Sequence, residues 1–241
     1  MKIAIVHDWL TGMRGGEKCL EVLCTLYPSA DLFTLLHIPG SVSSIIESHS
    51  IHTSFIQNLP FVESKYRYYL PLMPLAIERF NFQKYDLIIS SSHCVAKSVK
   101  PRSGSLHICY CHTPMRYIWD QFDQYFCITK SGLIPWVIMK LLRPWFQRWD
   151  SKTSSRVDHY IANSRHVQKR IKKYYQREAT VIHPPVDTKR FKPSGHRENE
   201  YFLIVSAFAP YKRVDLAVEA FNKLGYHFVI VGEGQDSNSL R

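Results

Sequence analysis

Short, continuous apolar runs recur along this chain, and each is followed by a loop and then by a helix-like segment. Residues 2–8, 85–91, 106–110 and 157–163 are such runs. Runs of this length without polar alternation are typical of strands covered on both faces, as in a parallel sheet. Because the strands alternate with helices, the sequence predicts an α/β fold with a doubly wound parallel sheet.

Further elements complete this pattern. They are strands over residues 31–36 and 179–183, helices over residues 17–26 and 66–80, and a basic helix ending at residue 175. Pro71 and Pro74 lie inside one of these helices and predict that it is broken or kinked, because proline removes a backbone donor.

The chain divides into one complete predicted domain and part of a second. Residues 1–183 are long enough to bury a core of their own. Residues 184–200 begin with two prolines and are predicted to be a linker. Residues 201–241 form one strand, one helix and a second strand, whereas an α/β domain normally has ~100–200 residues. We therefore expect a truncated second domain with uncovered apolar strand residues, and a partner protein that supplies the missing half-domain.

The chain is basic, with 31 Lys and Arg, 20 Asp and Glu, and a net charge of +11. This excess suggests an anionic partner. No nucleic-acid motif accompanies the charge, so nucleic acid is not the expected partner. Residues 3–6 are too short for a signal peptide, and the longest apolar run, residues 133–139, is too short to span a membrane. The expected location is therefore the cytoplasm.

The cysteines do not predict a metal site. His107, Cys109 and Cys111 alternate and would share one face of a strand. No second pair of ligands with zinc spacing accompanies them, and none of the six cysteines forms a C-x-x-C pair. No metal cofactor is therefore expected.

Candidate site residues follow the predicted strands, at the sheet edge where α/β proteins bind ligands. Gly15 and Gly16 precede the first helix, where the backbone can approach a ligand and free N–H groups can meet a phosphate. His112 directly follows the strand 106–110, where an imidazole can orient a hydroxyl or move a proton. Each also has a purely structural interpretation, as a plain turn or a packed histidine.

A second group of candidates lies in residues 201–241. Lys212 and Arg213 come just before a helix with a consistent apolar face. Cations oppose the dipole at a helix N-terminus, so an anion such as a diphosphate would explain them, although both side chains could simply face water. Gly232 ends the last strand, and is either a nucleotide-facing turn or a plain turn.

Residues 133–149 mix apolar and aromatic side chains with Lys140, Arg143 and Arg148. Such a segment fits an amphipathic helix in a membrane interface. It fits equally well a core-facing helix that is interrupted by Pro144.

Six motifs occur together and in a specific order. They are IVHDWL at residues 5–10, GGE at 15–17, YCHTPMRYIWD at 110–120, IANSR at 161–165, IHPPVD at 182–187 and PYKRVD at 210–215. With these motifs the chain resembles the retaining glycosyltransferases of family 4. It is closest to the bacterial mannosyltransferase-like branch that builds surface polysaccharides and lipopolysaccharide. The resemblance implies a GT-B-type fold, here with one complete Rossmann-like N-terminal lobe and the first β-α-β unit of a second Rossmann-like lobe.

The resemblance also implies roles for individual residues. His112 matches the active-site histidine that contacts the donor sugar, and Gly15 and Gly16 match the loop that meets the donor diphosphate and the acceptor. Lys212, with Arg213 and Gly232, is assigned to the donor diphosphate. Arg116 and Tyr117, in the motif around His112, are assigned to the acceptor.

The implied reaction transfers a sugar from a nucleotide sugar, with GDP-mannose the leading candidate, to a lipid-linked or glycan acceptor without a metal. A peripheral position on the inner face of the membrane is a further expectation.

The chain departs from the family in two places, and two interpretations stay open. Ala207 stands where the family usually has an arginine, and the family's E-x7-E motif is absent. One interpretation is a truncated or split transferase. The alternative is a non-catalytic module that binds an acceptor or a partner and lacks the donor site.

Overall fold

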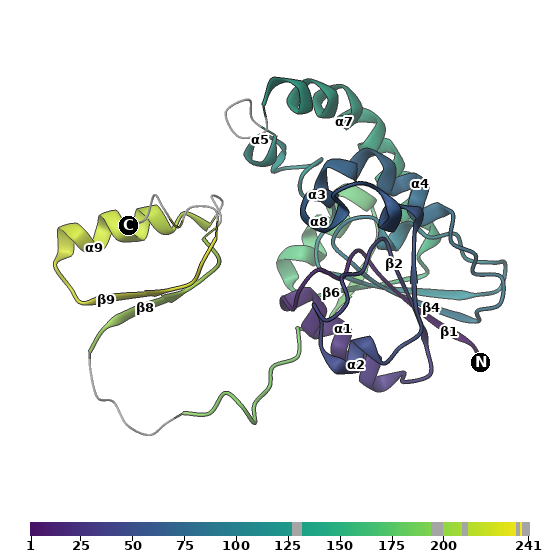
Figure 1. Ribbon diagram of the computed structural model, residues 1–241, viewed down its shortest axis with the longest axis horizontal. Helices are drawn as coiled ribbons and strands as arrows, with labels where there is room; N and C mark the ends of the chain where they lie inside the picture. Colours follow the sequence, from purple (N-terminus) through teal and green to yellow (C-terminus); the bar gives the residue numbers. More distant parts are fainter. Residues whose placement is uncertain (127–131, 194–199, 209–211, 235–236, 238–241) are drawn as a thin grey trace. The chain divides into compact units, whose positions relative to one another are not determined.

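The computed structural model describes residues 1–126, 132–193, 200–208, 212–234 and 237 of the chain (Figure 1). The chain forms two compact units, Met1–Val186 and Asp187–Arg241. Each unit is described by itself.

The first unit is built on a seven-stranded sheet with the strand order β3-β2-β1-β4-β5-β6-β7. All neighbouring strands are parallel. The strands are β1 (Ile3–His7), β2 (Asp31–Thr34), β3 (Ile51–Thr53), β4 (Leu87–Ser92), β5 (Leu106–Cys111), β6 (His159–Ala162) and β7 (Ala179–Val181). This sheet confirms the predicted α/β fold, although the edge strand β3 was not predicted.

Helices connect the strands. They are α1 (Gly15–Leu26), α2 (Ser44–Glu47), α3 (Val62–Lys65), α4 (Met73–Glu78), α5 (Phe122–Tyr125), α7 (Leu133–Thr153) and α8 (Arg165–Tyr175), with 3₁₀ helices at Phe55–Asn58, Tyr66–Leu72, Ala96–Ser98 and Ser154–Arg156. In Figure 1, α1 and α2 lie on one side of the sheet and α3 and α4 on the other. The sheet is therefore covered on both faces, which explains its continuous apolar strands.

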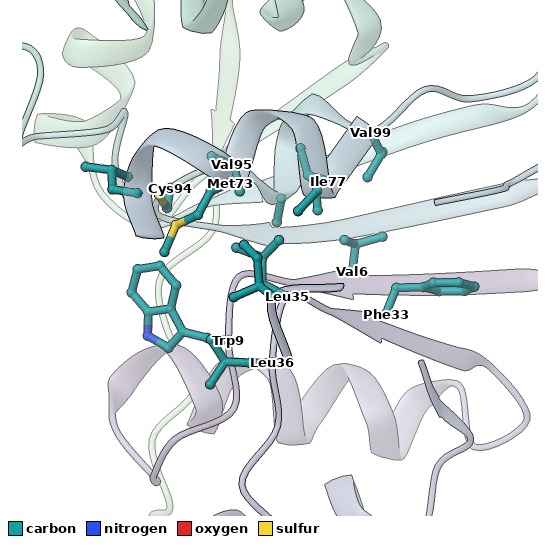
Figure 2. Close-up of a cluster of buried hydrophobic side chains, with 14 of the residues drawn as sticks. Val6, Trp9, Phe33, Leu35, Leu36, Met73, Ile77, Cys94, Val95 and Val99 are labelled. Carbon is teal, nitrogen blue, oxygen red and sulfur yellow. The ribbon is translucent and has the colours of Figure 1, made fainter. Parts of the chain in front are cut away.

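Alternate residues of β1 point into two of the three core clusters, one on each face of the sheet. Val6 points into the larger cluster, where Phe33 of β2 and Met73 and Ile77 of α4 also lie (Figure 2). Ile5 points to the opposite face, which α1 and α2 cover. This alternation places every second residue after Ile5 on the α1 side of the sheet.

Two proline-containing helices behave differently. The helix predicted over residues 66–80 is broken as expected, into a 3₁₀ helix over Tyr66–Leu72 that contains Pro71 and the α-helix α4. In contrast, α7 runs through Pro144 over 21 residues, so of the two alternatives for this segment the helix interrupted at Pro144 is wrong. Arg143 and Gln147 on α7 donate hydrogen bonds to the Ile118 carbonyl at 2.9 and 2.7 Å, and thus hold the helix beside the proline.

The second unit contains the strands β8 (Phe202–Val205) and β9 (Phe228–Val231), which pair in parallel, and the helix α9 (Val214–Leu224) between them. Phe221 of α9 stacks on Phe228 with ring centroids 4.1 Å apart. Val205 and Val231 remain exposed, with 72% and 50% of their surface accessible. Among the described residues, β8 and β9 pair only with each other.

Candidate functional site

Three adjacent strands bring polar side chains together at their carboxyl ends. His7 is the last residue of β1, Ser91 lies near the end of β4, and His112 directly follows β5. His7 and Ser91 are partners in the β1–β4 register, and Ser91 is in register with Tyr110 of β5. These side chains share the face covered by α1, so the helix begins beside them.

Hydrogen bonds join the three side chains. Ser91 Oγ lies 3.1 Å from His7 Nδ1 and 2.9 Å from His112 Nε2. On its other side, His7 Nε2 lies 3.7 Å from Glu17 Oε1. His7 and Ser91 are fully buried, and Glu17 is buried as well. The site is therefore an ordered polar array inside the protein.

His112 is held neutral by its surroundings. Burial, with a smaller contribution from His7 and His93, lowers the pKa of His112 from 6.5 to about 3. The ring packs edge-on against Tyr110, with the centroids 5.3 Å apart. The backbone carbonyl of His112 accepts a hydrogen bond of 3.1 Å from the Asn163 side-chain amide. At neutral pH His112 therefore offers a neutral imidazole to a ligand.

Gly16 lies directly against this array. A side-chain carbon at Gly16 would come within 3.7 Å of His7 and 3.8 Å of His112 Nε2, which is ordinary van der Waals contact. Gly15, one residue earlier, has open space around the same position. Neither glycine is required by crowding within the protein. Both lie in the first turn of α1, where a helix leaves backbone N–H groups without an intrahelical acceptor.

A second carboxylate fixes the loop that follows β4. Asp8 Oδ2 accepts hydrogen bonds from the backbone N–H of His93 and Cys94, and Oδ1 accepts those of Val95 and Ala96, all between 2.7 and 2.9 Å. Burial raises the pKa of Asp8, but the neighbouring His93, 3.0 Å away, outweighs it and brings that pKa below the usual range. Asp8 is therefore a structural anion that shapes the rim of the site.

The two residues assigned to the acceptor occupy different surroundings. The Tyr117 hydroxyl donates a 3.4 Å hydrogen bond to the His93 carbonyl, which places Tyr117 beside the array. Burial raises the pKa of Tyr117 well above its usual value. Arg116 is half-buried, and its carbonyl accepts a hydrogen bond from Gln121.

Lys212, Arg213 and Gly232 lie in the second unit, so they are described apart from His112. Arg213 is the N-cap of α9, and its guanidinium pairs with Asp215 in the first helical turn at 2.9 Å. Asp215 thus supplies a counter-charge within the same turn. At Gly232 a side-chain carbon would lie 1.9 Å from the Ser206 carbonyl oxygen, so the local packing leaves room only for glycine. Lys212 is exposed.

Several site residues were not predicted from the sequence. They are His7, Asp8, Glu17, Ser91 and His93, which complete the array and its rim. The motifs over residues 5–10 and 15–17 contained the first three but gave them no role, and no motif contained Ser91 or His93. The available signal was the position of polar residues at the ends of apolar strands. That signal becomes specific only when the strand order is known.

Comparisons with solved structures show the same architecture. A crystal structure of Alr3699/HepE from Anabaena in complex with UDP matches 99% of this chain and 63% of its own, with a TM-score of 0.57 and 14% identity. A TarM mutant from S. aureus, in complex with fondaparinux, α-GlcNAc-glycerol and UDP, matches 100% of this chain and 74% of its own, with a TM-score of 0.57 and 10% identity. The chain thus spans less than two thirds of the first structure. At these identities the likeness concerns the fold.

Comparison with curated protein sequences finds no match. The family model described as Glycosyltransferase Family 4 matches residues 40–190, which is more than half of the chain. That range includes Ser91, His112 and the strands β4 to β7. By this match, the chain belongs to Glycosyltransferase Family 4.

Proposed function

We propose that this chain serves in the transfer of a sugar from a nucleotide sugar to a lipid-linked or polysaccharide acceptor. The observation that carries the proposal is the hydrogen-bonded array of His7, Ser91 and His112 beside Gly16, within a chain of this family. A neutral imidazole next to a glycine at a helix N-terminus suits a ligand that has both hydroxyl and phosphate groups.

In this proposal His112 contacts the donor sugar, and its neutral ring exchanges a hydrogen bond with a sugar hydroxyl. Gly15 and Gly16 bring the backbone of the α1 N-terminus close to the diphosphate. The helix dipole then favours the negative charge that develops on the leaving group. Tyr117, beside His93, is proposed to support the acceptor side together with Arg116.

The second unit is proposed to bind the rest of the donor. Lys212 and Arg213 precede α9 and are assigned to the diphosphate, with Gly232 at the end of β9 close to the nucleotide. Cationic side chains and helix ends would then stabilise the diphosphate without a metal ion. A partner protein, or a further segment of the same lobe, would cover the exposed strands β8 and β9.

GDP-mannose is the leading donor candidate, and surface polysaccharide or lipopolysaccharide synthesis is the proposed setting. UDP-linked sugars form the second donor class to test, because both similar structures were crystallised with UDP. The thermal stability of the full chain with each nucleotide sugar tests binding, since a ligand of the folded state raises the melting temperature. Stabilisation by an acceptor lipid alone would instead favour the non-catalytic binding module.

We also propose that the chain uses α7 to bind an anionic membrane surface, because lipid-linked acceptors reside in the membrane. No helix in the described ranges is long and apolar enough to cross a membrane. One surface of α7 nevertheless exposes apolar side chains: Leu133, Ile134, Val137, Ile138, Leu141 and Trp145. Lys140 and Arg148 are exposed on the same helix, and the net charge of +11 matches anionic lipid.

A further inference from the structure

Four side chains, from α1, β1, β4 and the residue after β5, form one line of polar contacts that ends at His112. Glu17 Oε1 lies 3.7 Å from His7 Nε2, His7 Nδ1 lies 3.1 Å from Ser91 Oγ, and Ser91 Oγ lies 2.9 Å from His112 Nε2. Because Ser91 has a single hydroxyl proton, it can donate to only one of the two imidazoles. The proton positions on His7 and His112 are therefore coupled.

At one end of this line, the charge on Glu17 determines which nitrogen of His7 carries the proton. The other oxygen of Glu17, Oε2, accepts the backbone N–H of Arg14 at 3.0 Å, which fixes the carboxylate. Burial raises the pKa of Glu17, but His7 outweighs it and brings the pKa below the usual value, so Glu17 is an anion at neutral pH. His7 Nε2 is buried and has no hydrogen-bond partner among the described residues. In this position an N–H is attracted to the carboxylate and a bare lone pair is repelled.

The order of donors then follows along the line. In its neutral form, with its single proton on Nε2, His7 presents a lone pair at Nδ1, and the Ser91 hydroxyl donates to it. The Ser91 oxygen is then the acceptor for His112, whose proton must be on Nε2. Within the described part of the chain, no hydrogen bond involves His112 Nδ1. This nitrogen keeps its lone pair.

We propose that Glu17 sets the tautomer of His112 through His7 and Ser91, and so makes His112 Nδ1 a hydrogen-bond acceptor for a sugar hydroxyl. The role of this acceptor in sugar transfer rests on the function proposed above, whereas the tautomer itself does not. Glu17, His7 and Ser91 are positioning residues, because each acts on the ligand through His112.

The other charged groups near His112 are already paired. Asp8 is held by His93 Nδ1 at 3.0 Å and by four backbone N–H groups. The rings of His93 and His112 are 6.4 Å apart between their centroids, and Tyr110 packs edge-on. None of these groups forms a hydrogen bond with an imidazole nitrogen of His112 among the described residues. Glu17 is thus the carboxylate that acts on His112 through hydrogen-bonding groups.

Nitrogen-15 NMR of the full chain with labelled histidine tests the proposal, since two-bond correlations show which ring nitrogen carries the proton. In the wild type at neutral pH, His7 and His112 should both carry their proton on Nε2. In Glu17→Gln, the amide oxygen can still accept the Arg14 N–H, and the NH₂ group then faces His7 Nε2 as a donor. Both histidines should switch to the Nδ1–H tautomer.

Two serine variants act as controls. Ser91→Ala removes the bridge, so adding Glu17→Gln to it should no longer change the tautomer of His112. Ser90 makes a similar hydrogen bond of 2.9 Å to His107 and belongs to the opposite face of β4. Ser90→Ala should leave the switch intact.

An Nδ1–H tautomer of His112 in the wild type overturns the proposal, as does an unchanged His112 in Glu17→Gln. Neither measurement depends on activity. If the spectra follow the prediction but His112→Ala still transfers sugar at full rate, the proposed function fails and the tautomer relay stands.

Discussion

The ammonium group of Lys97 lies 3.0 Å from Asp150 Oδ1, and both side chains are buried, with 1% and 0% of their surface exposed. Lys97 belongs to the 3₁₀ helix that follows β4, and Asp150 belongs to α7. Asp8 holds the start of the same segment through four backbone N–H groups. The rim of the site is thus fixed at one end by Asp8, directly after β1, and at the other by Asp150 of α7.

Lys97→Met should destabilise the first unit by about 3 kcal/mol, because it leaves the buried Asp150 carboxylate without its cation. Trp119 and Tyr175 still donate to Asp150 Oδ2, so the unit should fold. Urea unfolding measures the loss. Lys100→Met is the matched control, since Lys100 pairs with Glu78 at the surface, and it should cost much less. Equal losses in the two variants would contradict a special role for the buried pair.

Gly16→Ala should separate folding from ligand binding. The added methyl group meets His7 and His112 only at ordinary contact distance, and alanine is favoured over glycine in a helix by about 0.5–1 kcal/mol. The melting temperature should therefore stay equal or rise. The apparent affinity for the donor nucleotide sugar, measured from its thermal stabilisation of the protein, should fall at least about tenfold. The reason is that the methyl group occupies the approach to the helix N-terminus. A lower melting temperature without ligand would show that glycine serves packing instead.

His112→Gln should make the protein less sensitive to mild acid. The pKa of histidine is 6.5 in an unfolded chain, and burial lowers the pKa of His112 to about 3 in the folded site. Between these two values the unfolded chain binds a proton that the folded site does not, so the contribution of His112 to stability is present above pH 6.5 and is lost as the pH falls. Urea unfolding at about pH 7.5 and about pH 5 should show a smaller difference for the variant. The matched control is His166→Gln, an exposed histidine on α8.

The membrane proposal predicts that Ile134→Ser with Leu141→Ser reduces binding to vesicles that contain anionic lipid. These side chains expose 72% and 74% of their surface on α7, so their replacement should leave the fold intact. Each substitution removes an apolar side chain that would be buried in lipid. Full burial of such a side chain contributes about 1.5–3 kcal/mol to the free energy of membrane binding. Leu26→Ser, on α1, exchanges a similarly exposed leucine and should have no effect. Vesicle sedimentation that is unchanged in the α7 variant would argue against this surface.

Much of the fold could be predicted because the strands of a covered parallel sheet are continuous apolar runs. β1, β4, β5 and β6 were all found in this way. β3 was missed because it has only three residues, which are half-buried or exposed at the edge of the sheet. Whether α7 continues through Pro144 stayed open, because its continuity depends on tertiary contacts that local propensity does not report.

The candidate site was predictable only in part. Gly16 could be found because it lies at the start of the helix after β1, and His112 because it directly follows β5. The structure brings the two residues together. Ser91 joins His112 to His7 across separations of 21 and 84 residues. Such pairings follow from the placement of β4 between β1 and β5, which the sequence pattern does not encode.

The central claim is that His112 belongs to a site for sugar transfer. The most direct measurement is the incorporation of radiolabelled sugar into lipid-linked acceptors of a bacterial membrane extract by the full chain, with GDP-mannose tested first and UDP-linked sugars second. The account predicts incorporation by the wild type and by His166→Ala, and a loss of about 100-fold or more in His112→Ala. Equal incorporation by wild type and His112→Ala, or none from any donor, would contradict it.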